Sequence, residues 1–249
     1  MFRTMKKPPA AALLVLMAVL GTAQLAAQTQ YIDFSGYRWM VRRNDDPQGP
    51  MDNRFGPLGV NVFLRADGAL ILKIAKYNGY WYSGEVDTVQ SFGYGTYTFQ
   101  VETPIPKLHP DVIVGLFNYK DSRNEIDIEF SSWGWAPEDI VGDYCVQPWT
   151  TPGNLQYFDI KRFTVPSTHQ FVWTSTRIDF YSWIGYGPRP PANDPSLVTS
   201  WSYTNQAGIP KTTMPVLLNF YLFDGKDPRN YPNLLMEVVI KSFTFTPLQ

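Results

Sequence analysis

The stretch Glu125-Ile126-Asp127-Ile128-Glu129-Phe130 places three carboxylates at every second position, with apolar residues between them. Successive side chains of a β-strand point to opposite faces of its sheet. The pattern therefore predicts a strand with the three acids on one face and the apolar residues on the other. Like charges along one strand face repel each other, so folding alone gives little reason to gather them.

Acidic side chains in this arrangement suit a particular chemistry. Cleavage of a glycosidic bond requires two carboxyl groups in different protonation states, and a third nearby can separate their pKa values. An ordinary solvent-facing strand is the alternative interpretation. Such faces mix Thr, Lys and Ser with their acids, whereas every outward position of this run is acidic. We therefore expect catalysis at Glu125, Asp127 and Glu129.

The spacing of the acids also constrains the shape of the sheet. A flat strand would hold the backbones of Glu125 and Glu129 roughly 13 Å apart. A retaining glycosidase needs its two carboxyl groups about 5–5.5 Å apart. The two requirements are compatible only if the sheet is bent so that the acidic face is concave. The motif thus predicts a cleft across a curved sheet, a shape that suits a polymer.

The rest of the chain consists of short apolar runs separated by glycine and proline, with no convincing amphipathic helix. For 249 residues this predicts a single all-β domain, a β-sandwich or jelly roll. A proline-rich stretch over 185–195 is predicted to be a surface loop. The further predicted strands are 60–64, 69–74, 95–102, 112–118, 144–147, 157–163, 170–174, 177–183, 215–221 and 235–247.

Composition excludes several classes of protein. Aromatic residues make up 16% of the chain and charged residues 17%, which is not the composition of a disordered protein. The formal net charge of −1 provides no basic surplus to neutralise phosphates, which argues against nucleic-acid binding. Cys145 is the only cysteine, so no intrachain disulfide can form, and we expect a buried, inert thiol.

The N-terminus has the pattern of an export signal. Three cations within the first seven residues precede an apolar run over 10–20, and small residues follow up to Ala27. We expect a signal peptide over 1–27 and a single catalytic β-sandwich domain over 28–249. The mature protein would be secreted or periplasmic, with no membrane association after signal removal. An uncleaved anchor is the alternative.

Asn124 to Phe130 resembles the catalytic signature of glycoside hydrolase family 16, which includes lichenases, laminarinases and xyloglucan transglycosylases. The resemblance implies that Glu125 is the nucleophile, that Glu129 is the general acid/base and that Asp127 assists. It also implies a concanavalin-type jelly-roll β-sandwich with a concave substrate-binding sheet. The compact spacing of the acids resembles that of lichenases and xyloglucan transglycosylases more than that of laminarinases.

Other elements over most of the mature chain resemble the same family and imply substrate-binding residues. Glu85 lies in a Gly-Glu element, while Asn219 and Tyr221 lie in a late strand that carries a sugar-binding asparagine and an aromatic residue. Asn53 matches a further sugar-contacting asparagine weakly. The chain departs from the lichenase pattern at Asp87, where lichenases carry arginine, and at Tyr221, where they carry tryptophan.

Aromatic residues near the acids could stack on sugar rings. Trp133 has the same parity as Glu129 and is the first candidate, followed by Gln147 and Trp149 for further substrate contacts. Core packing is the alternative for any single tryptophan. We expect no catalytic metal and no required cofactor. Calcium could bind a loop through the acids at 45, 46 and 52, although a solvated turn is the alternative interpretation.

Three functional hypotheses follow. The first is an exported retaining endo-acting glycoside hydrolase that cleaves a β-linked polysaccharide, with a β-glucan as the expected substrate. The second is a transglycosylase on the same fold, which passes the glycosyl group to a sugar. The third is a non-catalytic carbohydrate-binding domain of the lectin type, although binding alone does not require all three acids. In each case we expect a polysaccharide partner and a monomeric protein.

Overall fold

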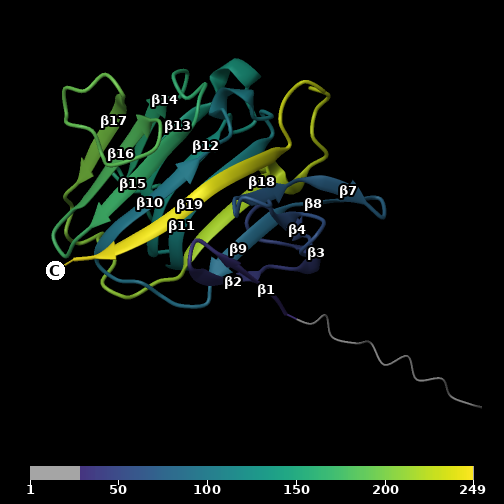
Figure 1. Ribbon diagram of the computed structural model, residues 1–249, viewed down its shortest axis with the longest axis horizontal. Coiled ribbons are helices and arrows are strands. Elements are labelled where there is room, and N and C mark those ends of the chain that lie inside the picture. The colour runs from purple at the N-terminus through teal and green to yellow at the C-terminus, as the bar shows by residue number, and fades with distance from the viewer. Residues whose placement is uncertain (1–28, 249) are drawn as a thin grey trace, which may run out of the picture.

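The computed structural model of the protein describes residues 29–248, so the predicted signal segment 1–27 lies outside the described residues. Within them the chain is all-β, with nineteen strands and three short 3-10 helices. Two large antiparallel sheets are stacked as layers (Figure 1). The predicted all-β sandwich is confirmed.

The larger sheet has eight strands, and the carboxylate strand β12 lies well inside it. In spatial order the strands are β1 (Gln30–Phe34), β2 (Tyr37–Val41), β9 (Gly84–Thr88), β18 (Val216–Leu222), β11 (Val112–Asp121), β12 (Asn124–Ser131), β13 (Val141–Val146) and β14 (Leu155–Asp159).

The second sheet has seven strands and covers the inner face of the first. In spatial order these are β17 (Leu197–Tyr203), β16 (Ile178–Ile184), β15 (Ser167–Trp173), β10 (Gly95–Val101), β19 (Glu237–Pro247), β6 (Leu70–Lys73) and β5 (Val62–Leu64). Two hairpins and three 3-10 helices complete the fold: β3 (Asn44–Gln48) with β4 (Asn53–Phe55), β7 (Ala75–Tyr77) with β8 (Tyr80–Tyr82), η1 (Ile105–Lys107), η2 (Pro137–Asp139) and η3 (Phe223–Gly225).

The core lies between the two large sheets and explains the alternation in the sequence. Ile126, Ile128 and Phe130 of β12 have no exposed surface and belong to the main apolar cluster. Burying a large apolar side chain contributes roughly 1.5–3 kcal/mol. The apolar face of β12 therefore fixes which way the strand faces, because a one-residue slip would put the three acids into the core.

The strands predicted from residue 60 onward are present with shifted ends, and 185–195 is a loop between β16 and β17. Several strands of the N-terminal third and β17 were not predicted. β3 has the sequence Asn-Asp-Asp-Pro-Gln and buries none of its residues, and β17, at a sheet edge, fully buries only Tyr203 of its seven residues. Edge strands of this kind lack the apolar alternation on which the predictions depend.

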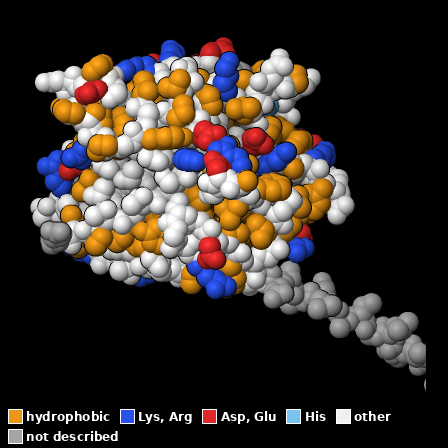
Figure 2. All heavy atoms as spheres, viewed as in Figure 1, with side chains coloured by type: hydrophobic (Ala, Val, Ile, Leu, Met, Phe, Trp, Pro, Cys, Tyr) orange, Lys and Arg blue, Asp and Glu red, His pale blue; other side chains and the backbone are white. Residues whose placement is uncertain are grey.

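Strands distant in sequence meet at the centre of the larger sheet. The yellow-green β18 lies between the blue β9 and the teal β11 (Figure 1). The surface seen from the same side mixes apolar, polar and charged side chains without a broad patch of one charge sign (Figure 2). Across residues 29–248 no helix is long and apolar enough to cross a membrane. Cys145 is a buried free thiol.

Candidate active site

Strand register places functional side chains in rows across the outer face of the larger sheet. Residues that face each other on antiparallel strands project from the same side of the sheet. The first row runs from β9 to β14 through Glu85, Asn219, Gly115, Glu129, Asp143 and Tyr157. At one strand spacing per step, this row spans about 24 Å.

The remaining catalytic candidates lie in the next two rows. Asp127 faces Phe117 on β11 and Cys145 on β13, and Glu125 faces Tyr119 on β11. The three acids therefore project from one face of β12 in three consecutive rows, as their alternation predicted. On β11 the residues beside Glu129, Asp127 and Glu125 are Gly115, Phe117 and Tyr119 in turn, and a space lies above the two glutamates.

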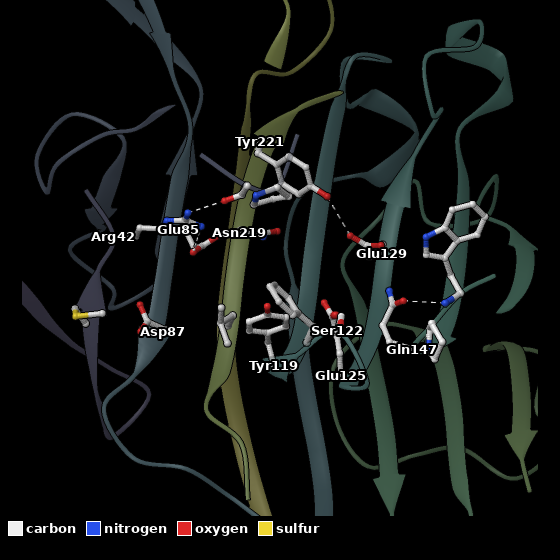
Figure 3. A pocket seen from close by; sticks show the side chains of 17 residues that line it. Arg42, Glu85, Asp87, Tyr119, Ser122, Glu125, Glu129, Gln147, Asn219 and Tyr221 are labelled. Atoms are coloured by element: carbon white, nitrogen blue, oxygen red, sulfur yellow. Dashed lines mark hydrogen bonds and ion pairs between the residues drawn. The ribbon is translucent and has the colours of Figure 1, made fainter. Parts of the chain in front are cut away.

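That space is a cleft of about 830 Å³ on the outer face of the larger sheet. Glu125 and Glu129 both line it, and both are half-buried. Asp127 is 2% exposed and lies beneath them. The labelled side chains of β9, β18, β11 and β12, and that of Gln147 just after β13, lie side by side along the cleft (Figure 3). The two glutamates thus face one open cleft, while Asp127 between them on the strand is buried.

Hydrogen bonds orient the acids. Gln147 donates from Nε2 to Asp127 Oδ2 at 3.2 Å, and its Oε1 accepts from the backbone N–H of Trp149 at 2.8 Å. Tyr221 donates from its hydroxyl to Glu129 Oε1 at 3.4 Å (Figure 3). Hydrogen-bond donors stabilise the ionised form of a carboxylate. Asp127 and Glu129 each have such a donor, Gln147 for the first and Tyr221 for the second.

Burial and mutual repulsion raise the pKa values of the acids. Burial and the charge of Glu129 raise the pKa of Glu125 to about 8, and the neighbouring Asp127 carboxyl opposes that rise. Burial raises the pKa of Glu129 to about 7, against the hydrogen bond from Tyr221. Burial, followed by the charges of Glu125 and Glu129, raises the pKa of Asp127 well above its usual range. The acids titrate as a set, which therefore retains protons near neutral pH.

A fourth carboxyl group, which sequence reasoning missed, belongs to this set. Asp143 faces Glu129 across the β12–β13 register and is 1% exposed. Burial and the charge of Glu129 raise its pKa well above its usual range. The Trp133 indole opposes that rise, although no hydrogen bond of full geometry joins the two groups. Asp143 and Cys145 alternate outward on β13, which was the available signal.

Comparison with known proteins adds evidence on the fold. No family model matches the sequence, and no curated protein matches it. The β-glucanase of Bacillus licheniformis matches the structure with a TM-score of 0.62 at 17% identity, over 89% of this chain and 98% of that one. The fold is that of this glucanase.

Two further solved structures agree. A β-1,3-1,4-glucanase (lichenase) from a mouse hindgut metagenome has a TM-score of 0.58 at 16% identity, over 84% of this chain and 93% of that one. A family 16 glycosyl hydrolase protein of Mycobacterium smegmatis has a TM-score of 0.55 at 17% identity, over 81% and 89% of the two chains. The concanavalin-type jelly roll expected from the catalytic signature is therefore present.

One end of the cleft in this glucanase fold holds an ion pair. Arg42 donates from Nη1 to Glu85 Oε1 at 2.9 Å, and Asn219 donates from Nδ2 to Glu85 Oε2 at 3.2 Å (Figure 3). Burial raises the pKa of Glu85, and Arg42 opposes that rise. Arg42 follows β2 and was not predicted. It brings a guanidinium to the end of the cleft that Asp87 also lines.

Asn53, unlike the other predicted substrate-binding residues, lines neither this cleft nor the smaller cavity beside it. Its Nδ2 donates to Leu222 O at 2.8 Å, and its Oδ1 accepts from Leu222 N at 3.0 Å and from Ser83 Oγ at 2.8 Å. The side chain is 3% exposed. Asn53 therefore fastens its loop to the end of β18, and this placement does not support the predicted sugar contact.

The predicted aromatic candidates gather on the other side of the acids. Trp133, Gln147 and Trp149 line a smaller cavity that also contacts Glu129. Trp133 has a φ of 50°, a left-handed conformation that non-glycine residues rarely adopt. Its backbone N–H donates to Ser131 Oγ at 3.0 Å, and its ring packs edge-on against Phe223. These contacts hold the indole beside Glu129.

The calcium hypothesis receives no geometric support. Asp45 accepts from the Tyr82 hydroxyl at 3.4 Å and pairs with Arg43 at 3.9 Å. Neither Asp45, Asp46 nor Asp52 is part of a group of three or more potential metal ligands, and no such group occurs within residues 29–248.

Proposed function

We propose that the protein is a retaining, endo-acting glycoside hydrolase of family 16 that cleaves a β-linked polysaccharide, specifically a β-glucan. The observation that carries this proposal is the row of acids on β12 at the floor of a cleft crossing the larger sheet. Similar solved structures are a β-glucanase, a lichenase and a β-1,3-glucanase of Mycobacterium marinum, which support the choice of substrate.

The proposed reaction uses the acids in two steps. The Glu125 carboxylate attacks the anomeric carbon while protonated Glu129 donates its proton to the departing oxygen. A covalent glycosyl-enzyme intermediate forms on Glu125. Glu129, now ionised, removes a proton from water, whose oxygen attacks the anomeric carbon and releases Glu125. Asp127, held by Gln147, lies between the two on β12.

The charge of the cleft favours an uncharged glycan. Among the residues that line it, Arg42 is the only lysine or arginine, and it is paired with Glu85. Asp87, Glu125 and Glu129 line the same cleft without a cation of their own. A sulfated or uronate-rich polysaccharide would meet these carboxyls without a compensating charge. A neutral glucan avoids this repulsion.

Further parts of the proposal rest on the sequence pattern. We propose that the chain is exported after cleavage of the segment 1–27, and that it acts as a secreted or periplasmic monomer. The proposed reaction needs no cofactor, because the carboxyl groups themselves supply the nucleophile and the proton.

Incubation with a panel of β-glucans and galactans, followed by sizing of the products, tests the activity. We expect shorter chains from β-glucans, with the β-anomer formed first when the products are followed by NMR. Glu125→Gln should reduce hydrolysis by at least about a thousandfold and leave the fold intact. Glu237→Gln, on β19 of the other sheet, is the matched control and should keep full activity.

Each alternative result has a distinct meaning. Redistributed chain lengths without net shortening would indicate a transglycosylase. Measurable binding without any change of length would indicate a lectin. Full activity in Glu125→Gln would remove Glu125 from the role of nucleophile.

A further inference from the structure

Arg229 lies in the connection between β18 and β19 and joins it to two other segments. Its Nε donates to Asp111 Oδ1 at 2.8 Å, and its backbone N–H donates to Asp111 Oδ2 at 2.7 Å. Its Nη2 donates to Trp135 O at 2.8 Å. Asp111 immediately precedes β11, and Trp135 lies between β12 and η2. One guanidinium thus connects three parts of the chain that are distant in sequence.

His109 closes the same arrangement. The backbone N–H of Asp111 donates to His109 Nδ1 at 3.1 Å, so this nitrogen carries no proton. His109 Nε2 lies 2.9 Å from Arg229 O, and Nε2 is the donor because a carbonyl oxygen only accepts. His109 is 3% exposed and Asp111 is 9% exposed. We call His109, Asp111 and Arg229 the Arg229 clamp. Its charge-assisted bonds are stronger than those of an ordinary exposed ion pair, because they reach a carboxylate shielded from water.

The segments that the clamp joins carry a small apolar cluster, separate from the main core. Its members are Phe55, Ile113 and Tyr221, with Trp133 and Phe223 packed against them. Ile113 lies two positions after Asp111, and Trp133 lies two positions before Trp135. The backbone N–H of Phe223 donates to Asp111 O at 2.9 Å. The clamp therefore ties together the backbone segments from which this cluster is built.

Two members of the cluster border the proposed general acid. The Tyr221 hydroxyl donates to Glu129 Oε1 at 3.4 Å (Figure 3). Trp133 lines the smaller cavity that Glu129 also borders. The bond from Tyr221 is long, so a small displacement of the ring would break it. The orientation of the Glu129 carboxyl therefore depends on how firmly the cluster is held.

We propose that Arg229 is a positioning residue for the general acid, because the clamp holds the cluster that places Tyr221 and Trp133 beside Glu129. This inference rests on the proposed function, in which Glu129 donates the proton. Arginine suits the role, since its planar fork serves a carboxylate and a carbonyl together. The single ammonium group of a lysine does not reproduce that fork.

Two substrates with the same glycon separate a role in proton donation from a role in the fold. One is a β-gluco-oligosaccharide, whose departing oxygen needs a proton. The other is a dinitrophenyl β-glycoside, whose leaving group departs without one. Arg229→Gln should lower kcat/KM about tenfold on the oligosaccharide and less than about twofold on the dinitrophenyl glycoside. Glu129→Gln should show the same selectivity to a larger extent.

Asp111→Asn tests whether the clamp acts as one unit. The single variant should show the same selective loss, and combining it with Arg229→Gln should add little, because residues that share one interaction are not additive. Arg65→Gln is the matched control, since Arg65 donates from Nη1 and Nη2 to the Glu102 carboxylate and follows β5 of the other sheet. It should leave both rates unchanged.

Urea unfolding establishes that each variant is folded. If Arg229→Gln alone fails to fold, Asp111→Asn carries the comparison of the two substrates. Failure of both variants to fold would overturn the proposal, because the clamp would then serve the fold and not the acid.

Equal losses on both substrates would also overturn the proposal, and so would unchanged rates or additive losses in the double variant. An inactive wild type, or a Glu129→Gln variant that loses equally on both substrates, would instead overturn the proposed function. A selective loss in Glu129→Gln together with an unselective loss in Arg229→Gln would remove only the clamp from its role.

Discussion

At the scale of single residues, the environment of each acid matters more than its identity. Glu125 and Glu129 are chemically alike and lie on one strand face, yet different neighbours act on them. Their pKa values, about 8 and about 7, belong to a coupled set. The proposed reaction uses the form with Glu125 ionised and Glu129 protonated, whereas in the free protein burial and the charge of Glu129 give Glu125 the higher pKa of the two. Activity should therefore peak near neutral pH and decline on both sides.

Tyr221→Phe tests how the Tyr221 hydroxyl affects the pKa of Glu129. The Tyr221 hydroxyl stabilises the ionised form of Glu129, so it lowers the pKa of Glu129. Removing it makes the doubly ionised pair less favourable. The alkaline limb of the kcat/KM profile should move to higher pH, by up to about one pH unit. An alkaline limb that stays in place or moves to lower pH would contradict this role, whatever the change in maximal rate.

At the scale of elements, the register of β18, β11 and β12 brings Asn219 and Glu129 to either side of Gly115. A Cβ at Gly115 would lie 2.4 Å from Asn219 Oδ1. Because Gly115 has no side chain, the Asn219 amide can occupy this position at the floor of the cleft. Asn219 in turn donates to Glu85, so one glycine positions two polar side chains of the cleft.

Gly115→Ala should therefore impair activity through its neighbours. Displacing the Asn219 amide should lower kcat/KM about tenfold, with a change in unfolding free energy of no more than about 2 kcal/mol. Steady-state kinetics and urea unfolding measure the two effects. Gly93→Ala is the control, because a Cβ there meets only Thr213 Cγ2, at 3.5 Å. Wild-type kinetics in Gly115→Ala would show that the Asn219 position is unimportant.

At the scale of the whole molecule, the site brings together several carboxyl groups that have no cationic partner, and this changes how the unfolding free energy depends on pH. The folded protein raises the pKa values of Glu125, Asp127, Glu129 and Asp143 above those of the unfolded chain. The folded state then binds more protons than the unfolded state between about pH 4.5 and pH 8. The contribution of these groups to the unfolding free energy therefore falls as the pH rises through that window.

Glu129→Gln should relieve this effect. The variant should be more stable than the wild type at pH 8 by on the order of 1 kcal/mol, and the difference should shrink towards pH 4.5. Urea unfolding at a series of pH values measures it. Glu237→Gln should follow the wild-type pH dependence. If Glu129→Gln and the wild type lose stability in parallel, Glu129 does not carry an unfavourable charge in the folded protein.

The sequence by itself determined the strand at 124–131, its two faces and the all-β class, because side-chain alternation and apolar burial are local properties of a strand. It also indicated Glu85, Asn219 and Tyr221, which all line the cleft. Only the tertiary structure placed Asp143 beside Glu129 and Arg42 beside Glu85. The sequence of one strand does not specify which strand pairs with it or in which register. The tertiary structure likewise placed Asn53 outside the cleft, because the backbone N–H and C=O of Leu222, distant in sequence, both bond to its side-chain amide.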